Sequence, residues 1–201
     1  MSRVIAFFDF DGTITTKDTL LEFIKYSKGS FRFYLGFGLN SPWLIAWKLG
    51  IISNQKAKER ILRFFFKNRA LDDFQQECDR FSEEIIPGLL RPKALEEIAR
   101  LQKAGAELVI VSASPGNWIR GWAGHIGSAL QATQLETRLL NDQPRLTGRI
   151  DGRNCHGLEK VRRIRAAWSL SDYQHIYTYG DSSGDKPMLE LGTISFYKPF
   201  R

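Results

Sequence analysis

Residues 4–13, Val4-Ile5-Ala6-Phe7-Phe8-Asp9-Phe10-Asp11-Gly12-Thr13, pass from an apolar run directly into two carboxylates and a glycine. Five consecutive apolar residues without polar alternation are typical of a central strand that is covered on both faces. Side chains alternate along a strand, so Asp9 and Asp11 are expected on the same side. The stretch therefore predicts a buried strand that delivers acidic groups to one edge of a sheet.

These acids have two open explanations. Neighbouring carboxylates repel each other unless a cation or a proton compensates, and a hard divalent metal is the simplest cation for oxygen ligands. Gly12 would let the backbone turn tightly and present its N–H groups to an anion. Asp-Gly is also an ordinary turn pair at the end of a strand, so the stretch alone does not separate a binding site from a turn.

The composition is that of a globular protein. The chain has 201 residues, of which 43% are hydrophobic, enough for one sizeable core with a smaller inserted subdomain. The first residues reach Asp9 too soon for a signal peptide, which favours the cytoplasm. Cys78 and Cys155 lack metal-ligand spacing and are expected as reduced thiols.

The formal net charge of +7 favours an anionic partner, namely a phosphorylated metabolite, an acidic lipid surface or a nucleic acid.

From about Thr16 to Ile86 the pattern is helical and unusually aromatic, which predicts an insertion. Residues 31–52 are almost long enough to cross a bilayer, but polar residues and a proline interrupt them, so a membrane span is not favoured. The next expected helix, about residues 55–68, carries five cations, with Arg69 directly after it, beside Phe64-Phe65-Phe66 and one acid, Glu59. It suits either a membrane-surface helix or, more commonly, a packed helix with a solvated basic side. A last helix is expected over residues 71–85.

From Pro92 onwards helices and strands alternate. We expect a helix over 92–105, a strand over 107–111 and a further helix with Pro115 in its first turn. A strand over 129–135, a hairpin over 138–150, a helix containing Lys160, and strands over 175–179 and 194–197 complete the pattern. Such alternation predicts an α/β fold with a doubly wound, Rossmann-like parallel sheet, in which ligands bind beyond the carboxyl ends of the strands.

Several of these expected strand and helix ends carry polar groups. Ser112 follows the second strand at a helix N-terminus, a natural anion site, although serine there is also a helix cap. Lys160 lies in the first turn of its helix, where it opposes the helix dipole unless an acid is nearby; in isolation a solvated lysine is the better explanation. Asp181 and Asp185 also suit turn and capping roles. Oxygen donors recur at three strand ends, which favours a common binding site over separate turns and caps. His125 and His156 are expected to be structural or exposed.

With these residues the chain resembles the haloacid dehalogenase superfamily, in the branch of phosphoserine phosphatases, subfamily IB. Asp9-Phe10-Asp11-Gly12-Thr13 is similar to the first motif, Ser112 to the second, Lys160 to the third, and residues 180–185 to the fourth. The spacing of Asp18, the Ser-Ala-Ser-Pro run, the Asn-Cys-x-Gly-x-x-Lys run and the Asp-Ser-x-x-Asp ending look most like the bacterial subgroup that includes one type of phosphatidylglycerophosphatase.

The resemblance implies a catalytic core of residues 1–15 and 87–201 and a helical cap of residues 16–86. It implies that Asp9 is the nucleophile, that Asp11 is the general acid and base, and that Mg²⁺ lies between the Asp9 carboxylate, the Asp11 carbonyl and Asp181. The phosphoryl group would be held by Ser112, Lys160 and the backbone at Gly12 and Ala113, with Asp185 in support. Asp18 and Arg60 are candidate residues for substrate recognition by the cap.

The chain also departs from phosphoserine phosphatases. It has Asp18 where they have a glutamate, and Gly184 where they have an asparagine; both positions help to recognise serine. We therefore expect a Mg²⁺-dependent phosphatase that forms an aspartyl-phosphate and acts on a phosphomonoester with a lipid or apolar portion, such as phosphatidylglycerophosphate or a lysophosphatidate. It would meet this substrate at an anionic membrane surface on the cytoplasmic side.

Two alternatives stay open. One is a soluble metabolite phosphatase, with phosphoserine as the best-known substrate. The other, from another class, is a nucleic-acid-binding module, because basic charge among aromatic residues can stack bases. The acids and the lysine at strand and helix ends have no purpose in such a module, so no nucleic-acid partner is expected. The sequence gives no indication of the oligomeric state.

Overall fold

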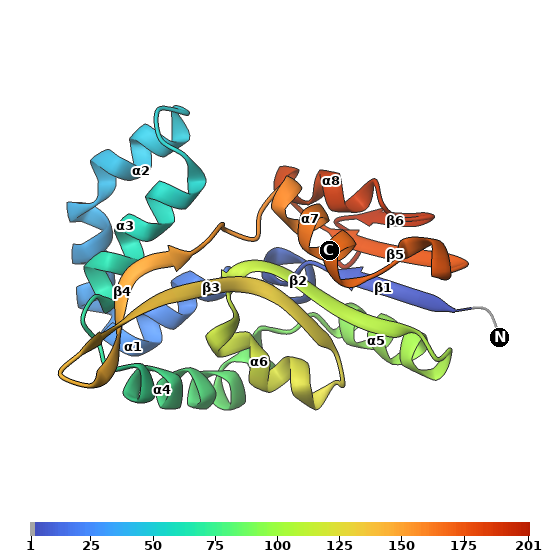
Figure 1. Ribbon diagram of the computed structural model, residues 1–201, viewed down its shortest axis with the longest axis horizontal. Coiled ribbons are helices and arrows are strands. Elements are labelled where there is room, and N and C mark those ends of the chain that lie inside the picture. The colour runs from blue at the N-terminus through green and yellow to red at the C-terminus, as the bar shows by residue number, and fades with distance from the viewer. Residues whose placement is uncertain (1–2) are drawn as a thin grey trace.

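The computed structural model of the protein describes residues 3–201, which form one six-stranded sheet in the order β4-β3-β2-β1-β5-β6 (Figure 1). The strands are β1 (Val4–Phe8), β2 (Glu107–Pro115), β3 (Ala129–Leu140), β4 (Gln143–Asp151), β5 (His175–Gly180) and β6 (Ile194–Tyr197). The neighbouring strands pair in parallel, except that β4 runs antiparallel to β3. The expected doubly wound α/β fold is confirmed.

The central strand β1 explains why the opening run has no polar alternation. It pairs with β2 on one side and β5 on the other, so both its edges are used. Ile5 and Phe7 pack into one hydrophobic cluster, and Ala6 and Phe8 pack into the other. Both faces of β1 are therefore buried, and the strand ends at Phe8, directly before the buried carboxylate of Asp9.

Helices cover both faces of the sheet. On one face lie α5 (Pro92–Lys103) and α6 (Gly116–His125), and on the other lie α7 (Leu158–Ala167) and α8 (Lys186–Leu189) (Figure 1). Short helical turns lie at Phe10–Ile14, Ile86–Leu89, Leu170–Asp172 and Ser183–Asp185. Cys78 and Cys155 are buried and free, as expected.

Four helices fill the segment that was expected as a helical insertion: α1 (Thr19–Leu39), α2 (Ser41–Lys48), α3 (Asn54–Phe66) and α4 (Leu71–Glu84). Within residues 3–201, no helix has the length and apolar character that crossing a membrane requires. Phe23 of α1 packs against Phe66, Phe74, Phe81 and Trp118, so these helices share one buried cluster with a face of the sheet. The division into core and cap stays a prediction.

Two expected boundaries are wrong. The strand over 129–135 and the first arm of the hairpin are one continuous strand, β3, which turns into β4 at Asn141 and Asp142, both at positive φ. β2 continues to Pro115, which pairs with Thr133 after a shift in register, and α6 begins only at Gly116. Pro115 therefore ends a strand instead of lying in the first turn of the helix, because pairing with β3 extends the backbone that far.

Candidate functional site

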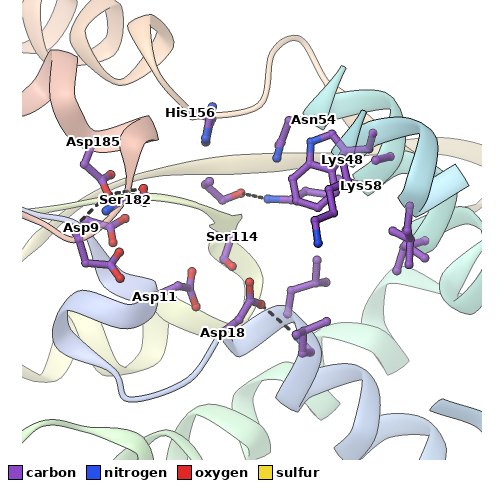
Figure 2. Close-up of a pocket in the computed structure, with 18 of the residues that line it drawn as sticks. Asp9, Asp11, Asp18, Lys48, Asn54, Lys58, Ser114, His156, Ser182 and Asp185 are labelled. Carbon is purple, nitrogen blue, oxygen red and sulfur yellow. Dashed lines mark hydrogen bonds between the residues drawn. The ribbon is translucent and has the colours of Figure 1, made fainter. Parts of the chain in front are cut away.

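A pocket of about 600 Å³ lies between the carboxyl ends of the strands and helices α1, α2 and α3 (Figure 2). Asp9 follows β1, Asp181 follows β5, and Ser112 lies near the end of β2, so neighbouring parallel strands bring them to one edge of the sheet. The polar lining is Asp9, Asp11, Asp18, Ser41, Lys48, Asn54, Lys58, Ser114, His156, Lys160, Asp181, Ser182 and Asp185. Acids that are far apart in the sequence therefore meet in one pocket.

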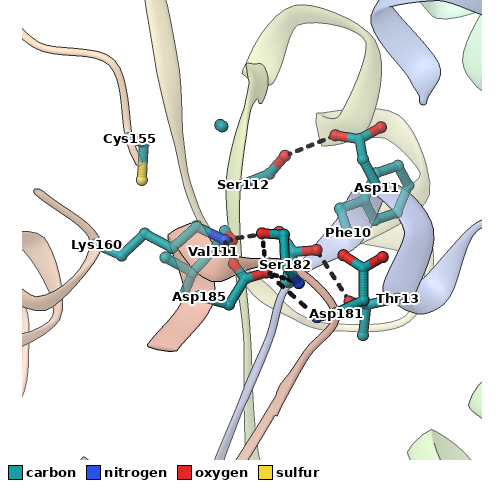
Figure 3. Close-up of polar contacts among 12 residues, drawn as sticks. Phe10, Asp11, Thr13, Val111, Ser112, Cys155, Lys160, Asp181, Ser182 and Asp185 are labelled. Carbon is teal, nitrogen blue, oxygen red and sulfur yellow. Dashed lines mark hydrogen bonds and ion pairs between the residues drawn. The ribbon is translucent and has the colours of Figure 1, made fainter. Parts of the chain in front are cut away.

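A buried lysine joins two of these acids (Figure 3). The ammonium Nζ of Lys160 lies 2.6 Å from Asp9 Oδ1, 2.7 Å from Asp185 Oδ1 and 2.7 Å from the carbonyl oxygen of Val111. Lys160 is 1% exposed, so the solvated lysine is the wrong explanation. Burial alone would lower its pKa, but the carboxylates of Asp9 and Asp185 outweigh that effect and raise it above the ordinary value. Lys160 therefore stays a cation in the site.

The carboxyl group of Asp9 is buried and only partly compensated. Its Oδ2 accepts a hydrogen bond of 3.0 Å from Thr13 Oγ1, and its Oδ1 pairs with Lys160. Burial raises the pKa of Asp9 to about 7, against the opposing attraction of Lys160 and with further repulsion from Asp185. Asp9 therefore needs more positive charge nearby before it is fully ionised at neutral pH.

The acidic cluster suits a hard metal ion. Oxygen atoms of Asp9, Asp181 and Asp185 lie within 4.8 Å of one another. Asp9 and Asp185 pair with the buried Lys160, and Asp181 Oδ2 pairs with Arg201 at 2.6 Å, so three carboxylates share two cations. Burial and Asp185 raise the pKa of Asp181. Carboxylate oxygens with uncompensated charge are the donors that Mg²⁺ prefers, so the residues fit the expected cofactor.

Asp11 points elsewhere, and its carboxylate lies outside that cluster. Its Oδ1 accepts two hydrogen bonds of 2.6 Å from the backbone N–H and the hydroxyl of Thr19, at the start of α1. Its Oδ2 accepts from Ser112 Oγ at 3.3 Å. Thr19 Oγ1 in turn accepts from Trp118 Nε1 at 3.0 Å. A metal contact of Asp11 would have to use its backbone carbonyl, and it stays a prediction.

The expected phosphate-binding residues lie around this edge. Ser112 is fully buried, and its Oγ accepts a hydrogen bond of 3.0 Å from the N–H of Ser114, which holds the loop over Ala113 in a tight curve. Ala113 and Ser114 line the pocket. Gly12 turns the chain after β1 with φ of +80°. The structure thus places Gly12, Ser112, Ala113 and Lys160 around the acids, and their roles stay predictions.

The two residues that were expected to recognise the substrate, Asp18 and Arg60, differ in position. Asp18 begins α1, accepts a hydrogen bond of 3.2 Å from the N–H of Leu21 and lines the pocket. Desolvation by the surrounding protein and the negative charge of the neighbouring Asp11 raise the pKa of Asp18 to about 6. Arg60 does not line the pocket; its Nε donates to Asn40 Oδ1 at 2.9 Å and its guanidinium lies over Trp43. Arg60 therefore ties α3 to the start of α2.

Sequence reasoning missed Lys58 and His156. Lys58 follows the buried Ala57 on α3, and its Nζ donates to the carbonyl oxygen of Ala113 at 2.9 Å, so one member of the basic helix points into the site. Its position beside the apolar stripe of Ala57 and Ile61 was the available signal. His156, expected as structural or exposed, lines the pocket and packs against Gly184, whose missing side chain leaves room for the imidazole.

The chain is similar to several known proteins. The family model of haloacid dehalogenase-like hydrolases matches residues 6–190. The chain is 35% identical to protein CicA of Caulobacter vibrioides over 195 residues, which are 96% of this chain and 85% of CicA. It is 28% identical to a probable phosphatase of Mycobacterium tuberculosis, over 100% of this chain and 70% of the relative.

A solved structure has a similar fold. It is a phosphoserine phosphatase described as a phospho-aspartyl intermediate analogue, with a TM-score of 0.60 and 16% identity, over 97% of this chain and 86% of the other. At this level of identity the likeness shows the shared fold.

Proposed function

The chain belongs to the haloacid dehalogenase-like hydrolase family, and we propose that it is a Mg²⁺-dependent phosphatase that hydrolyses a phosphomonoester through an aspartyl-phosphate on Asp9. The observation that carries the proposal is the buried Lys160, which joins Asp9 to Asp185 beside Asp181 at one edge of the sheet. A cation and an acid cluster at this place suit phosphoryl transfer, in which positioning and charge neutralisation supply most of the catalysis. The named relative in Mycobacterium tuberculosis supports the same class of reaction.

In the first step a carboxylate oxygen of Asp9 attacks phosphorus, and the bond from phosphorus to the substrate's ester oxygen breaks. Asp11 donates its proton to the leaving oxygen, so that an alcohol departs and the phosphoryl group stays on Asp9. Thr19 holds Asp11 Oδ1 through two hydrogen bonds, which leaves Oδ2 with only the longer contact to Ser112. We assign the transferred proton to Asp11 Oδ2.

In the second step a water molecule attacks the same phosphorus. Asp11, now ionised, takes a proton from that water, and the bond between phosphorus and the Asp9 oxygen breaks. Inorganic phosphate leaves, Asp9 returns as a carboxylate, and Asp11 is protonated again. One carboxyl group thus serves as acid and then as base.

Other residues would bind the negatively charged phosphoryl group during its transfer. Lys160, Ser112 and the backbone N–H groups at Gly12 and Ala113 would bind the phosphoryl oxygens, and Asp185 keeps Lys160 in place. Asp9, Asp181 and the Asp11 carbonyl would hold the metal. When bound, Mg²⁺ supplies positive charge that neutralises phosphoryl oxygens and favours the ionised form of Asp9.

For the substrate we propose a phosphomonoester with a lipid or apolar portion, such as phosphatidylglycerophosphate or a lysophosphatidate. The cap side of the pocket is mainly apolar and is lined by Leu20, Leu21, Phe37, Leu44, Ile45, Trp47, Ala57 and Ile61. Such a wall gains free energy only from a substrate with apolar surface to bury. The proposal includes peripheral contact with an anionic membrane on the cytoplasmic side, because a lipid phosphate is presented from a bilayer.

The second candidate is a soluble metabolite phosphatase that acts on phosphoserine. Asp18 favours it, because a carboxylate in the pocket can pair with an ammonium group of a substrate. An amino-acid phosphate would leave most of the apolar wall uncovered, which is why we place this candidate second. A nucleic-acid-binding module leaves the buried Lys160 and its two acids without a purpose.

The test is phosphate release by the purified protein with Mg²⁺ on phosphoserine, short-chain phosphatidylglycerophosphate, lysophosphatidate and sugar phosphates. Asp9→Asn is the control, because it keeps the size of the side chain and removes the nucleophile. A lipid preference that Asp9→Asn abolishes supports both reaction and substrate. A preference for phosphoserine supports the reaction with the second candidate, and activity that survives in Asp9→Asn contradicts the mechanism.

A further inference from the structure

A second, smaller cavity lies on the surface of the helical segment. It has a volume of about 300 Å³ and is lined by Lys28, Arg32 and Leu35 of α1 and by Phe64 and Phe65 of α3. We call it the α1–α3 groove. None of its residues lines the catalytic pocket, so the groove has no part in the chemistry described above.

The groove forms because α1 and α3 approach closely at Gly36. Gly36 is buried, and a β-carbon there would overlap the rings of Phe64 and Phe65. The two phenylalanines therefore lie directly against the backbone of α1, and Leu35 lies beside them. Phe64 is 46% exposed and Leu35 is 50% exposed, so this apolar floor is open to solvent.

Two cations stand at the groove without an acidic partner. Among the ion pairs formed within residues 3–201, none includes Lys28 or Arg32, and the nearby Glu77 pairs with Arg69 instead. Burial lowers the pKa of Lys28, and Arg69 and Arg32 lower it further, against a smaller opposing effect of Glu77. A bound anion would relieve this repulsion, and an arginine next to a lysine is a combination that binds phosphate well.

The positive charge of the chain is concentrated in the helical segment that carries this groove. Residues 25–69 contain ten Lys or Arg residues and one acidic residue, Glu59, whereas the rest of the chain has a small excess of acidic residues. The same segment carries the exposed apolar side chains Phe31, Tyr34, Leu35, Leu39, Trp43, Ile45, Trp47, Leu49, Ile51 and Phe64. Cations together with exposed aromatic and aliphatic groups are the signature of a surface that lies in the interface of an anionic membrane.

We propose that the α1–α3 groove binds the phosphate headgroup of one anionic phospholipid and thereby docks the helical segment on an anionic bilayer. Lys28 and Arg32 would bind the phosphate, and Leu35, Phe64 and Phe65 would contact the first part of an acyl chain. The proposal deepens the proposed function, on which its choice of partner rests. A nucleic acid fits less well, because bases stack on aromatic rings but leave Leu35, Leu39 and Ile51 exposed to water.

The test is co-flotation of the full chain with vesicles of phosphatidylcholine alone or of phosphatidylcholine with 30% phosphatidylglycerol. We expect binding to the anionic vesicles only. The double variant Lys28→Gln/Arg32→Gln should bind at least about tenfold more weakly, because each basic group near an anionic surface contributes substantially. The matched control is Lys93→Gln/Lys103→Gln on α5, which removes the same charge from exposed sites outside the segment and should bind as the parent does.

Three results would overturn the proposal. The first is equal binding by the two double variants, and the second is equal binding to both kinds of vesicle. The third is a dimer of the free protein that dissociates in Lys28→Gln/Arg32→Gln, because the occupant of the groove would then be a second copy of the chain. Hydrolysis of soluble p-nitrophenyl phosphate, measured on the same samples, should be the same in all variants and reports folding. If the parent floats with anionic vesicles but does not hydrolyse this probe, the phosphatase proposal is contradicted and the lipid-binding proposal is supported. If the parent hydrolyses the probe but does not float, only the lipid-binding proposal is contradicted.

Discussion

Asp181 lies directly against the α-carbon of Gly12, so close that a β-carbon on Gly12 would be 2.5 Å from Asp181 Oδ2. This contact joins the turn after β1 to the end of β5 and brings Asp181 next to Asp9. Gly12 also has φ of +80°, a backbone conformation that residues with a side chain rarely adopt. The glycine in the first motif is therefore needed for two separate steric reasons.

Gly12→Ala should lower kcat/KM by about 100-fold, because a displacement of about 1 Å in a reacting group has that order of effect. Phosphate release measures it. Gly127→Ala is the control, because Gly127 also has positive φ but open space at its β-carbon position. We expect the control to lose about 1 kcal/mol of stability and to keep its activity. Full activity in Gly12→Ala would contradict the close packing.

Thr19→Val should lower kcat by about tenfold with little change in KM, because it removes one of the two hydrogen bonds that fix Asp11 Oδ1. Trp118→Phe should act in the same direction but less, since it removes only the N–H that donates to Thr19. Thr16→Val is the control, because the hydroxyl of Thr16 bonds to the carbonyl of Leu89, away from Asp11. A rise in KM alone would contradict a positioning role.

The buried Asp9 should make stability fall as pH rises in metal-free protein. Its pKa is about 7 in the folded chain and 3.8 ordinarily, so between these values the folded state holds a proton that the unfolded chain has lost. The melting temperature in EDTA should therefore drop from pH 5 to pH 8 by several degrees more in the parent than in Asp9→Asn. Equal pH slopes in the two proteins would contradict the shifted pKa.

Mg²⁺ should raise the melting temperature more at pH 8 than at pH 5. At pH 5 a proton occupies Asp9, and binding of the metal must displace it, whereas at pH 8 the carboxylate is free. The shift should be small in Asp181→Asn, which removes one charged donor of the cluster. A thermal shift that is the same at both pH values would place the metal away from Asp9.

Lys58→Met should lower kcat/KM by about tenfold or more, because Lys58 connects α3 to the carbonyl of Ala113 beside the phosphoryl-binding loop. Methionine retains the length and apolar stem of lysine and removes only the ammonium group. Lys56→Met is the matched control on the same helix, where the side chain is exposed. Equal activity in both variants would show that Lys58 serves packing alone.

Gly148→Ala should destabilise the protein by about 3 kcal/mol or more, which thermal unfolding can measure. Gly148 has positive φ, and a β-carbon there would overlap the backbone of Arg63 where β4 crosses α3. Gly152→Ala on the same segment has the same φ strain without any neighbour, so about 1 kcal/mol is expected. Similar losses in the two variants would contradict the close crossing of β4 and α3.

The sequence predicted the sheet well because the spacing of apolar residues shows which side chains are buried. The apolar run from Val4 and the alternation of helices and strands predicted a parallel sheet and the edge where the acids meet. Lys160 could be assigned only by resemblance, since nothing local shows that a lysine in a helical first turn will reach Asp9. The partners of a buried charge come from another part of the chain and are invisible in a short pattern.

The helical segment over residues 16–86 was less predictable for a related reason. The basic residues of α3 look alike in sequence, yet Lys58 enters the pocket and Arg60 binds Asn40. Helical spacing gives the face of a side chain but not what lies opposite that face. Pairing with β3 likewise extended β2 to Pro115, against the local preference of proline for a helix start.

The ring of Phe23 is completely buried between α3, α4 and α6, so the helices after the first motif and one face of the sheet share a single interior. We therefore expect this segment and the sheet to unfold together. Denaturant should unfold the whole chain in one cooperative transition, and limited proteolysis should not release residues 16–86 as a folded fragment. Any opening of the pocket for substrate must then come from the outer part, α2 and the loop after it, where no side chain of the helix is buried.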